Sequence, residues 1–291
     1  MGGRVPRNPF TAKRPARASL PSTPAPGGLV IEPSFDQPQV EPRSIPDAFA
    51  FLGGVDYDLP DDTIHWYHTI DLPDGTRTPG LFDHRELLPH YGLPTDMTGR
   101  TAIDVATYDG YWAFEMEKRG AVVSALDIAA ADQLDIPFPA RAAMAGRKHQ
   151  PIGIGFEAAH TALGSSVKKI KANVYDLDPS VHGTFDFVHM ADLLLHLRRP
   201  LDALAAVRSI TGTEALIVDA FDPALSRGAI GAPTQYVGGW DGVLWWLPSY
   251  DALAQMIVDA GFASVHVNLV YALSKVHETA ALWRASITAK V

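Results

Sequence analysis

The stretch TAIDVATYDGYWAF, residues 101–114, places polar groups where a strand-like run gives way to the start of a helix. The apolar run reaches Asp104, a turn continues to Gly110, and aromatic residues follow. Loops that cradle a pyrophosphate need several glycines at such a turn, because the backbone must approach the phosphates closely. This turn keeps only Gly110, so we expect its ligand to lack a pyrophosphate.

A second acid, Asp127, closes the next strand-like run. Its distance from the turn is close to the ~20 residues expected for an acid that binds both ribose hydroxyls of an adenosine, although an Asp here also caps a following helix. After the third run, Val174 and Tyr175 are placed to flank an adenine ring. S-adenosylmethionine fits this pattern, since it joins adenosine to a sulfonium and an amino-acid tail. Aromatic faces that attract a sulfonium, or that are ordinary core, occur at Tyr108, Tyr111 and Trp112.

Other aromatic side chains suggest walls for a substrate. The glycine-rich stretch 234–249 contains Trp240, Trp245 and Trp246. Loop aromatics beside a rigid scaffold suit the binding of a planar or apolar molecule, and they equally suit a lid over the core. Trp66 and Tyr67 are expected on the opposite wall. The histidines show no HxxxH spacing on a convincing helix, so no metal site is predicted.

The elements that must position these residues alternate along the chain from residue 100 onward. Strand-like runs fall at 101–106, 121–127, 167–176, 185–191, 214–221, 264–270 and 277–287. One helix is expected to end at Gly120, and another to lie between the cap Ser249 and Gly261. Strands alternating with helices predict a parallel sheet covered on both faces. Only YALSKV separates the last two runs, which is too short for a crossover helix and predicts an antiparallel hairpin.

Composition excludes several functional classes. The 291 residues carry a formal net charge of -9 and no cysteine, which argues against a general nucleic-acid surface and excludes disulfides and thiolate chemistry. No apolar stretch approaches the ~20 residues of a membrane span, and no signal-peptide pattern is present, so a cytoplasmic location without membrane contact is expected. Residues 1–45 are basic and rich in Pro and Gly. They predict a disordered tail, with an arm for an anionic partner as the alternative.

The sequence resembles the class I S-adenosylmethionine-dependent methyltransferases in WYHTIDLPDGTRTPGLFDHRELLPHYGLP, GRTAIDVATYDGYWAFEMEKRGAVVSALDI, NVYDLDP, LLLHLRRPLDAL and GGWDGVLWWLPS. More narrowly, it is similar to the branch related to tRNA wobble-uridine carboxymethyl- and methyltransferases. The resemblance, over roughly residues 62–287, implies a doubly wound α/β fold: a seven-stranded, mostly parallel, Rossmann-like methyltransferase sheet with an antiparallel last strand. The expected domains are the tail (1–45), an N-terminal cap and substrate segment (46–98) and a methyltransferase domain (99–291).

The resemblance also implies roles for individual residues. The methionine portion of S-adenosylmethionine would face Asp104 and the turn that holds Ala106, Tyr108 and Gly110. Asp127 would hold the ribose, and the adenine would lie among Ile128, Val174 and Tyr175. The sulfonium side would be lined by Met190 and Ala191. Two positions depart from the family: Ala106 replaces a usual glycine, and Leu195 replaces a tyrosine of the carboxymethyl branch, which favours ordinary methyl transfer.

The expected activity is transfer of a methyl group to oxygen or nitrogen of a small molecule, such as a specialised metabolite. A hydroxyl nucleophile benefits from a base with a near-neutral pKa, for which His196 is the first candidate and His68 the second. His196 can instead be a helix-start histidine bonded to backbone. An amine nucleophile needs no base.

Three alternatives stay open at this stage. A tRNA-modifying methyltransferase would gain support from the basic tail and from a patch formed by Lys168, Lys169 and Lys171. A nicotinamide-dependent oxidoreductase needs a G-x-G-x-x-G turn, which DVATYDG does not supply. A non-catalytic adenosyl-binding partner subunit has Ala106 as its only indication. The oligomeric state is not predicted.

Overall fold

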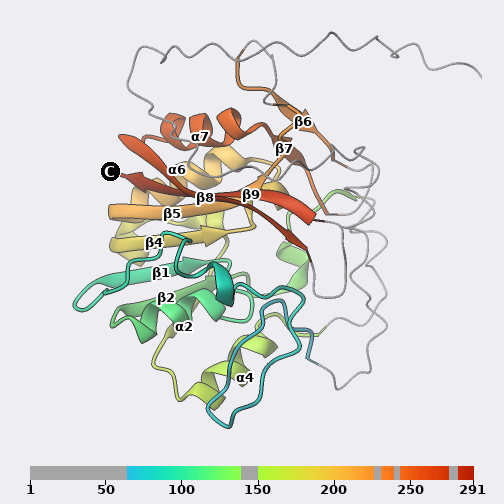
Figure 1. Cartoon of the computed structure of the whole chain (residues 1–291). Coiled ribbons are helices and arrows are strands. Elements are labelled where there is room, and N and C mark those ends of the chain that lie inside the picture. Colours follow the sequence, from blue (N-terminus) through green and yellow to red (C-terminus); the bar gives the residue numbers. More distant parts are fainter. Residues whose placement is uncertain (1–63, 139–149, 226–230, 239–242, 275–280) are drawn as a thin grey trace, which may run out of the picture.

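The computed structural model describes residues 64–138, 150–225, 231–238, 243–274 and 281–291. A central sheet of seven strands organises this part of the chain (Figure 1). In spatial order the strands are β3 (Lys168–Lys171), β2 (Val122–Asp127), β1 (Thr101–Val105), β4 (Phe185–Ala191), β5 (Thr211–Phe221), β9 (Ala281–Lys290) and β8 (Ser264–Ser274). The expected tail, residues 1–45, lies outside the described residues.

The pairing of these strands confirms the predicted sheet. β3, β2, β1, β4 and β5 are mutually parallel, whereas β9 runs antiparallel to both β5 and β8. β8 and β9 therefore form the hairpin predicted at the end of the chain. The order of strands reverses between β1 and β4, which places the topological switch point of the sheet between these two strands.

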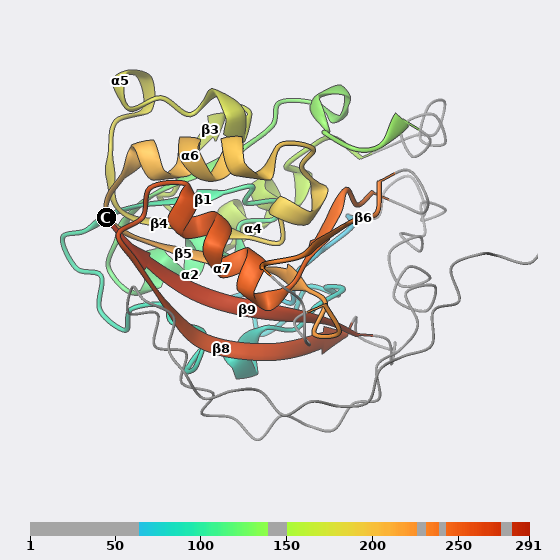
Figure 2. The same cartoon turned by 90° about the horizontal axis from the view of Figure 1, so that it is seen from above.

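Two apolar cores cover the two faces of the sheet. One face packs against α6 (Pro200–Ile210) and α7 (Tyr250–Asp259), which lie side by side in Figure 2. The other face packs against α2 (Tyr111–Lys118) and α4 (Ile154–Leu163). Because both faces are covered, β4 and β5 are almost continuously buried and read as apolar runs rather than alternating ones.

Local capping places the predicted helix ends correctly. The Ser249 hydroxyl accepts a hydrogen bond from the Ala252 amide and begins α7. After α2, Gly120 has φ 93°, and after α7, Gly261 has φ 101°. Both glycines adopt the left-handed conformation that ends a helix at little steric cost.

Two segments differ from their predicted form. The run 167–176 was expected to be one strand, but β3 ends at Lys171. The Asn173 side chain then accepts a hydrogen bond from the Tyr175 amide, which favours a short 3-10 turn over further pairing. The stretch 234–249, predicted as a loop, contains an antiparallel pair of short strands, β6 (Thr234–Tyr236) and β7 (Trp246–Pro248).

Short elements complete the described fold. They are η1 (Arg85–Leu87), η2 (Ala131–Gln133), η3 (Val174–Asp176), α5 (Pro179–His182) and η4 (Leu194–His196). Among the described residues, no helix combines the length and the apolar character needed to cross a bilayer. Most of the polar residues singled out from the sequence lie where the parallel strands end.

Candidate functional site

In an open α/β sheet, ligands bind beyond the carboxyl ends of the strands, close to the switch point. At this carboxyl end, the turn 106–110 follows β1, Asp127 closes β2, Asn173 follows β3 and Asp192 follows β4. The candidate site is built from these four positions and from the segments that pack over them.

The turn after β1 holds two non-glycine residues in the left-handed region. Ala106 has φ 62° and Tyr108 has φ 52°, a conformation that costs about 1 kcal/mol or more for a residue with a side chain. Hydrogen bonds compensate this cost: the Thr107 amide donates to the Leu126 carbonyl (3.0 Å) and the Tyr108 amide donates to Asp127 Oδ2 (3.0 Å). The turn is thus held in a strained shape by its neighbour strand, β2.

Asp104 supports this turn from below. Its side chain is buried, with Oδ1 at 2.7 Å from His189 Nδ1 and Oδ2 accepting a hydrogen bond from the Thr107 hydroxyl (2.7 Å). His189 also contacts the Tyr91 hydroxyl (3.3 Å). The expectation that Asp104 faces a ligand is therefore revised. Asp104 is only 1% exposed and both its carboxylate oxygens bind neighbouring side chains, so the residue positions the turn.

Asp127, predicted to bind the ribose, is held by two backbone amides. One carboxylate oxygen accepts the Tyr108 amide, and the other accepts the Ile128 amide (2.8 Å). Each oxygen has a second lone-pair direction left for a ligand hydroxyl. Burial raises the pKa of Asp127 to about 6, against the lowering effect of those two amides and of Lys169. A carboxyl group with a raised pKa at this end of the sheet makes Asp127 a candidate functional residue.

A cavity of about 380 Å³ lies beyond the ends of β2 and β3. It is lined by Gln133, Leu134, Asp135, Asn173, Tyr175, Arg198 and Arg199. The Tyr175 hydroxyl donates to Asp135 (2.7 Å), and the Arg199 guanidinium lies 4.3 Å from the centre of the Tyr175 ring. Val174, predicted beside it, points into the core and is 6% exposed. Of the predicted adenine neighbours, Tyr175 lines the cavity and the Val174 side chain does not.

The two described tryptophans of the predicted wall are anchored to the rim of this cavity. Trp245 Nε1 donates to the Asp135 carbonyl (2.6 Å), and Trp246 Nε1 donates to the Arg198 carbonyl (3.2 Å). The Arg198 side chain pairs with Asp135 and lies over the Trp245 ring at 5.3 Å. These contacts attach the two indole rings to segments that line the cavity. Trp240 lies outside the described residues.

The N-terminal segment that contains Trp66 and Tyr67, predicted as the opposite wall, is attached to the β1 turn. Asp109, fully buried in the β1 turn, accepts the backbone amides of Tyr67 (2.9 Å) and His68 (2.7 Å) and also contacts His68 Nδ1 (2.5 Å). Trp66 is half-buried against the core on the α2 face. The segment is therefore fixed to the turn, and His68 is committed to Asp109 as an anchor.

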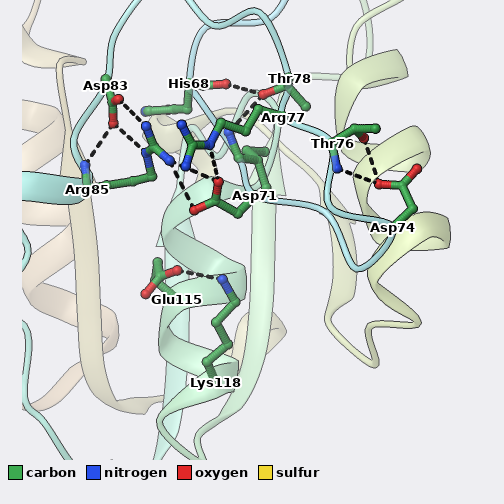
Figure 3. A network of polar contacts seen from close by, with 11 residues as sticks. His68, Asp71, Asp74, Thr76, Arg77, Thr78, Asp83, Arg85, Glu115 and Lys118 are labelled. Carbon is green, nitrogen blue, oxygen red and sulfur yellow. Dashed lines mark hydrogen bonds and ion pairs between the residues drawn. The ribbon is translucent and has the colours of Figure 1, made fainter.

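A surface network stiffens the same segment (Figure 3). Asp71 pairs with Arg77 (2.6 Å) and Arg85 (2.9 Å), and Arg85 also pairs with Asp83 (2.6 Å). Beside this network, the Thr78 hydroxyl donates to the His68 carbonyl (2.7 Å). Exposed ion pairs contribute little singly. Here they close the loop between residues 71 and 85 and keep its start against the site.

Sequence reasoning missed a buried ion pair at the end of β4. Asp192 has φ 48° and accepts hydrogen bonds from Arg284 Nε (2.7 Å) and from the Tyr67 hydroxyl (3.1 Å). Arg284, from β9, has a side chain only 3% exposed. Burial and the Asp192 charge raise the pKa of Tyr67 well above its ordinary value, so Tyr67 stays protonated as a donor. The sequence signal that could have identified Asp192 is an acid directly after the fourth predicted strand.

The remaining predicted residues occupy mixed positions. His196 ends η4 and donates from Nδ1 to the Val243 carbonyl (3.1 Å), while burial lowers its pKa. The structure thus contains the backbone contact given above as the alternative to a base. Met190 is 1% exposed in the core, so its side chain does not line a ligand site, whereas Ala191 is half-buried. Among the described residues, no group of three or more His, Asp or Glu is arranged to hold a metal.

Comparisons with known proteins identify the fold. Neither a protein-family model nor a curated protein sequence matches the chain. Among solved structures, the N-terminal domain of EvdMO1, crystallised in the presence of SAH and D-fucose, aligns with a TM-score of 0.50 and 14% identity over 78% of this chain and 91% of that one.

Two further structures align more loosely. A 1,6-didemethyltoxoflavin-N1-methyltransferase from Burkholderia thailandensis gives a TM-score of 0.44 and 16% identity over 71% and 73% of the two chains. A magnesium protoporphyrin IX methyltransferase from Synechocystis PCC 6803 gives 0.46 and 12% over 71% and 77%. The alignment with EvdMO1, together with the strand order and the reversed β9, shows a Rossmann-like methyltransferase fold.

Proposed function

We propose that this chain is an S-adenosylmethionine-dependent methyltransferase that acts on oxygen or nitrogen of a small molecule. The observation that carries the proposal is Asp127, a desolvated carboxylate held by the strained β1 turn beside the switch point of a methyltransferase-type sheet. A specialised metabolite as substrate and a cytoplasmic location belong to the same proposal.

The residues at the carboxyl end of the sheet fit the cofactor. Asp127 has lone pairs to receive two ribose hydroxyls, and the cavity beyond the ends of β2 and β3, which Asp127 itself does not line, offers Asn173 and Tyr175 to an adenine. The β1 turn presents few glycines, as suits a ligand without phosphates. When bound, the cofactor supplies an electrophilic methyl group on a sulfonium. The chain supplies the orientation, and water is excluded by the walls on both sides.

Substrate access lies between the two walls already described. The N-terminal segment, fixed by Asp109, closes one side, and the segment with Trp245 and Trp246 closes the other. The fold relative EvdMO1 was crystallised with SAH, S-adenosylhomocysteine, and a sugar, which agrees with this proposal without identifying the substrate.

A tRNA substrate is not favoured by the described surface. Lys168 and Lys171 are exposed on β3, but Lys169 between them pairs with Glu157 (3.0 Å) and covers the Phe156 ring (4.8 Å). The three lysines therefore do not present three free charges to a phosphate backbone. With a net charge of -9, the chain also lacks the overall basic character that RNA binding favours.

Titration calorimetry with S-adenosylhomocysteine, with NAD as a parallel control, tests the cofactor. We expect micromolar binding of S-adenosylhomocysteine alone, and a loss of about tenfold or more in Asp127→Ala, because two buried ribose hydroxyls lose their acceptor. Unchanged affinity in this variant would contradict the assignment. A screen of small molecules for methyl-donor consumption then identifies the acceptor, and saturable binding without turnover on any class would favour a non-catalytic subunit.

A further inference from the structure

The ion pair of Asp192 and Arg284 lies at the place where the reacting end of the proposed cofactor belongs. Adjacent strands of a sheet are ~4.8 Å apart, so the ends of β2 and β4 are separated by about 10 Å across β1. An adenosine held by Asp127 at β2 therefore directs the rest of the molecule across the β1 turn toward the end of β4. Asp192 is the first residue after that strand.

Contacts across the site tie Asp192 to the β1 turn. Tyr67 donates its hydroxyl to Asp192 (3.1 Å), and the Tyr67 ring lies 5.7 Å from that of Tyr108 in the turn. Asp192 thus lies next to Tyr67, which links the end of β4 to the β1 turn, and 12% of the Asp192 side chain is exposed. The Asp192 side chain is therefore neither fully exposed to solvent nor fully buried in the core.

Two features of Asp192 cost folding free energy and are therefore unexpected for a residue with a purely structural role. Its φ of 48° is unfavourable for a residue other than glycine, and its buried partner Arg284 requires desolvation of a full charge. Well-packed apolar residues often replace such a pair without loss of stability. Because strain and buried charge cluster at functional sites, their combination at the end of β4 indicates a role in the reaction.

The charges at this point restrict which acceptor group fits. Arg284 balances Asp192, and the adjacent Asp219 is buried and accepts the amides of Leu193 (3.0 Å) and Leu194 (2.7 Å). The described residues at this point leave no excess positive charge to receive an anionic acceptor. An ionised carboxylate has about four lone-pair directions, and the described partners of Asp192 use two of them.

We infer that Asp192 receives the O–H or N–H of the methyl acceptor, so the acceptor is a neutral hydrogen-bond donor and not a carboxylate or phosphate. This inference rests on the proposed function. In the transfer, the acceptor lone pair forms the bond to the methyl carbon, and the carbon–sulfur bond breaks with its electron pair left on sulfur. The acceptor proton passes to the Asp192 carboxylate and then to water. Arg284 and Tyr67 hold the carboxylate in place.

A cofactor analogue tests the inference before any substrate is known. Sinefungin carries an amino group on carbon where S-adenosylmethionine carries the methyl group on sulfur, and its ammonium donates hydrogen bonds from the position of the reacting methyl. S-adenosylhomocysteine lacks any group there. If Asp192 borders that position, sinefungin binds the wild-type protein at least about tenfold more tightly than S-adenosylhomocysteine, as a charge-assisted hydrogen bond provides.

The variants separate this contact from effects on folding. Asp192→Asn keeps the shape and tolerates the left-handed backbone, and we expect it to abolish the preference for sinefungin while the Kd for S-adenosylhomocysteine changes less than threefold. Because the substitution leaves Arg284 without its counter-charge, the double variant Asp192→Asn/Arg284→Gln provides a second measurement with both charges removed. Asp186→Asn, at the opposite end of β4, is the matched control and should keep the preference.

The outcomes distinguish the two levels of the proposal. Loss of the preference in both Asp192 variants, with S-adenosylhomocysteine still bound, supports the acceptor role of Asp192. An equal affinity of the wild type for the two compounds, or a preference that survives in the double variant, overturns it while leaving the cofactor assignment intact. Absence of binding of either compound to the wild type overturns the proposed function and this inference together.

Discussion

Asp127 links cofactor binding to pH, because its carboxylate titrates in an accessible range. Its pKa, raised by burial to about 6, means that acidification below this value protonates the ribose acceptor. We expect affinity for S-adenosylhomocysteine to be constant above pH 7 and to fall by about tenfold per pH unit below pH 6. Titration calorimetry between pH 5 and 8 measures this dependence. Asp127→Asn should bind weakly throughout, and a flat wild-type profile would contradict the role of Asp127.

Ala106 is a second residue with a specific consequence. It adopts φ 62° in the β1 turn, where a methyl group costs energy that glycine does not. Glycine also increases the entropy of the unfolded chain, which offsets part of the gain. We expect Ala106→Gly to raise the free energy of unfolding by up to about 1 kcal/mol and Ala106→Val to lower it by about 2 kcal/mol. Denaturant unfolding measures both, and a less stable glycine variant would show that the turn is not strained.

At the scale of elements, Asp109 joins the N-terminal segment to the β1 turn. Asp109→Ala removes the acceptor of two backbone amides and of the His68 ring. We expect a loss of about 2–4 kcal/mol of stability and faster hydrogen exchange of the amides of residues 67–70. Asp74→Ala, in the exposed loop of the same segment, should change stability by less than about 1 kcal/mol. Equal effects of the two variants would show that Asp109 does not anchor the segment.

The elements were largely predictable, whereas the contacts between them were not. Apolar runs predict β1, β2, β4 and β5 because both faces of these strands are buried, and the short connection predicts the β8–β9 hairpin. Strand ends also locate Asp127. The pairing of Asp192 with Arg284 joins positions 92 residues apart, and no local pattern encodes it. Likewise, the burial of Asp104 depends on His189 from the neighbouring strand.

Periodicity also fails where side chains compete with the backbone. Asn173 accepts the Tyr175 amide and ends β3 earlier than the apolar pattern suggests. The glycine-rich stretch near Trp246 forms β6 and β7 because hydrogen bonds between the two segments satisfy their backbone amides and carbonyls. His196 Nδ1 donates to the Val243 carbonyl. Its expected role as a base stays a prediction.

For the whole molecule, a buried histidine sets a sensitivity to acid. His84 is 2% exposed, its Nδ1 has no hydrogen-bond partner among the described residues, and burial lowers its pKa well below 6.5. As pH falls through 6.5, the unfolded chain binds a proton that the folded chain does not, so stability present above this pH is lost. We expect His84→Leu to lose less stability than the wild type between pH 7 and 5.

Thermal unfolding at several pH values measures this difference. For each variant, the difference in free energy of unfolding from the wild type is compared between pH 7 and 5. Binding of one proton changes this difference by at most about 1.4 kcal/mol per pH unit. His266→Leu, at an exposed position on β8, is the matched control. Parallel curves for the wild type and His84→Leu would show that another group dominates the response to acid.

The reversed strand β9 has a consequence for how this protein is made. β9 follows β8 in the chain yet lies between β5 and β8 in the sheet. During synthesis, β8 therefore has no strand to pair with until β9 has been made. The same strand carries Arg284, the counter-charge of Asp192. Completion of the sheet and completion of the site are therefore one event. A chain that ends before β9 lacks both the central partner of β5 and β8 and the counter-charge of Asp192.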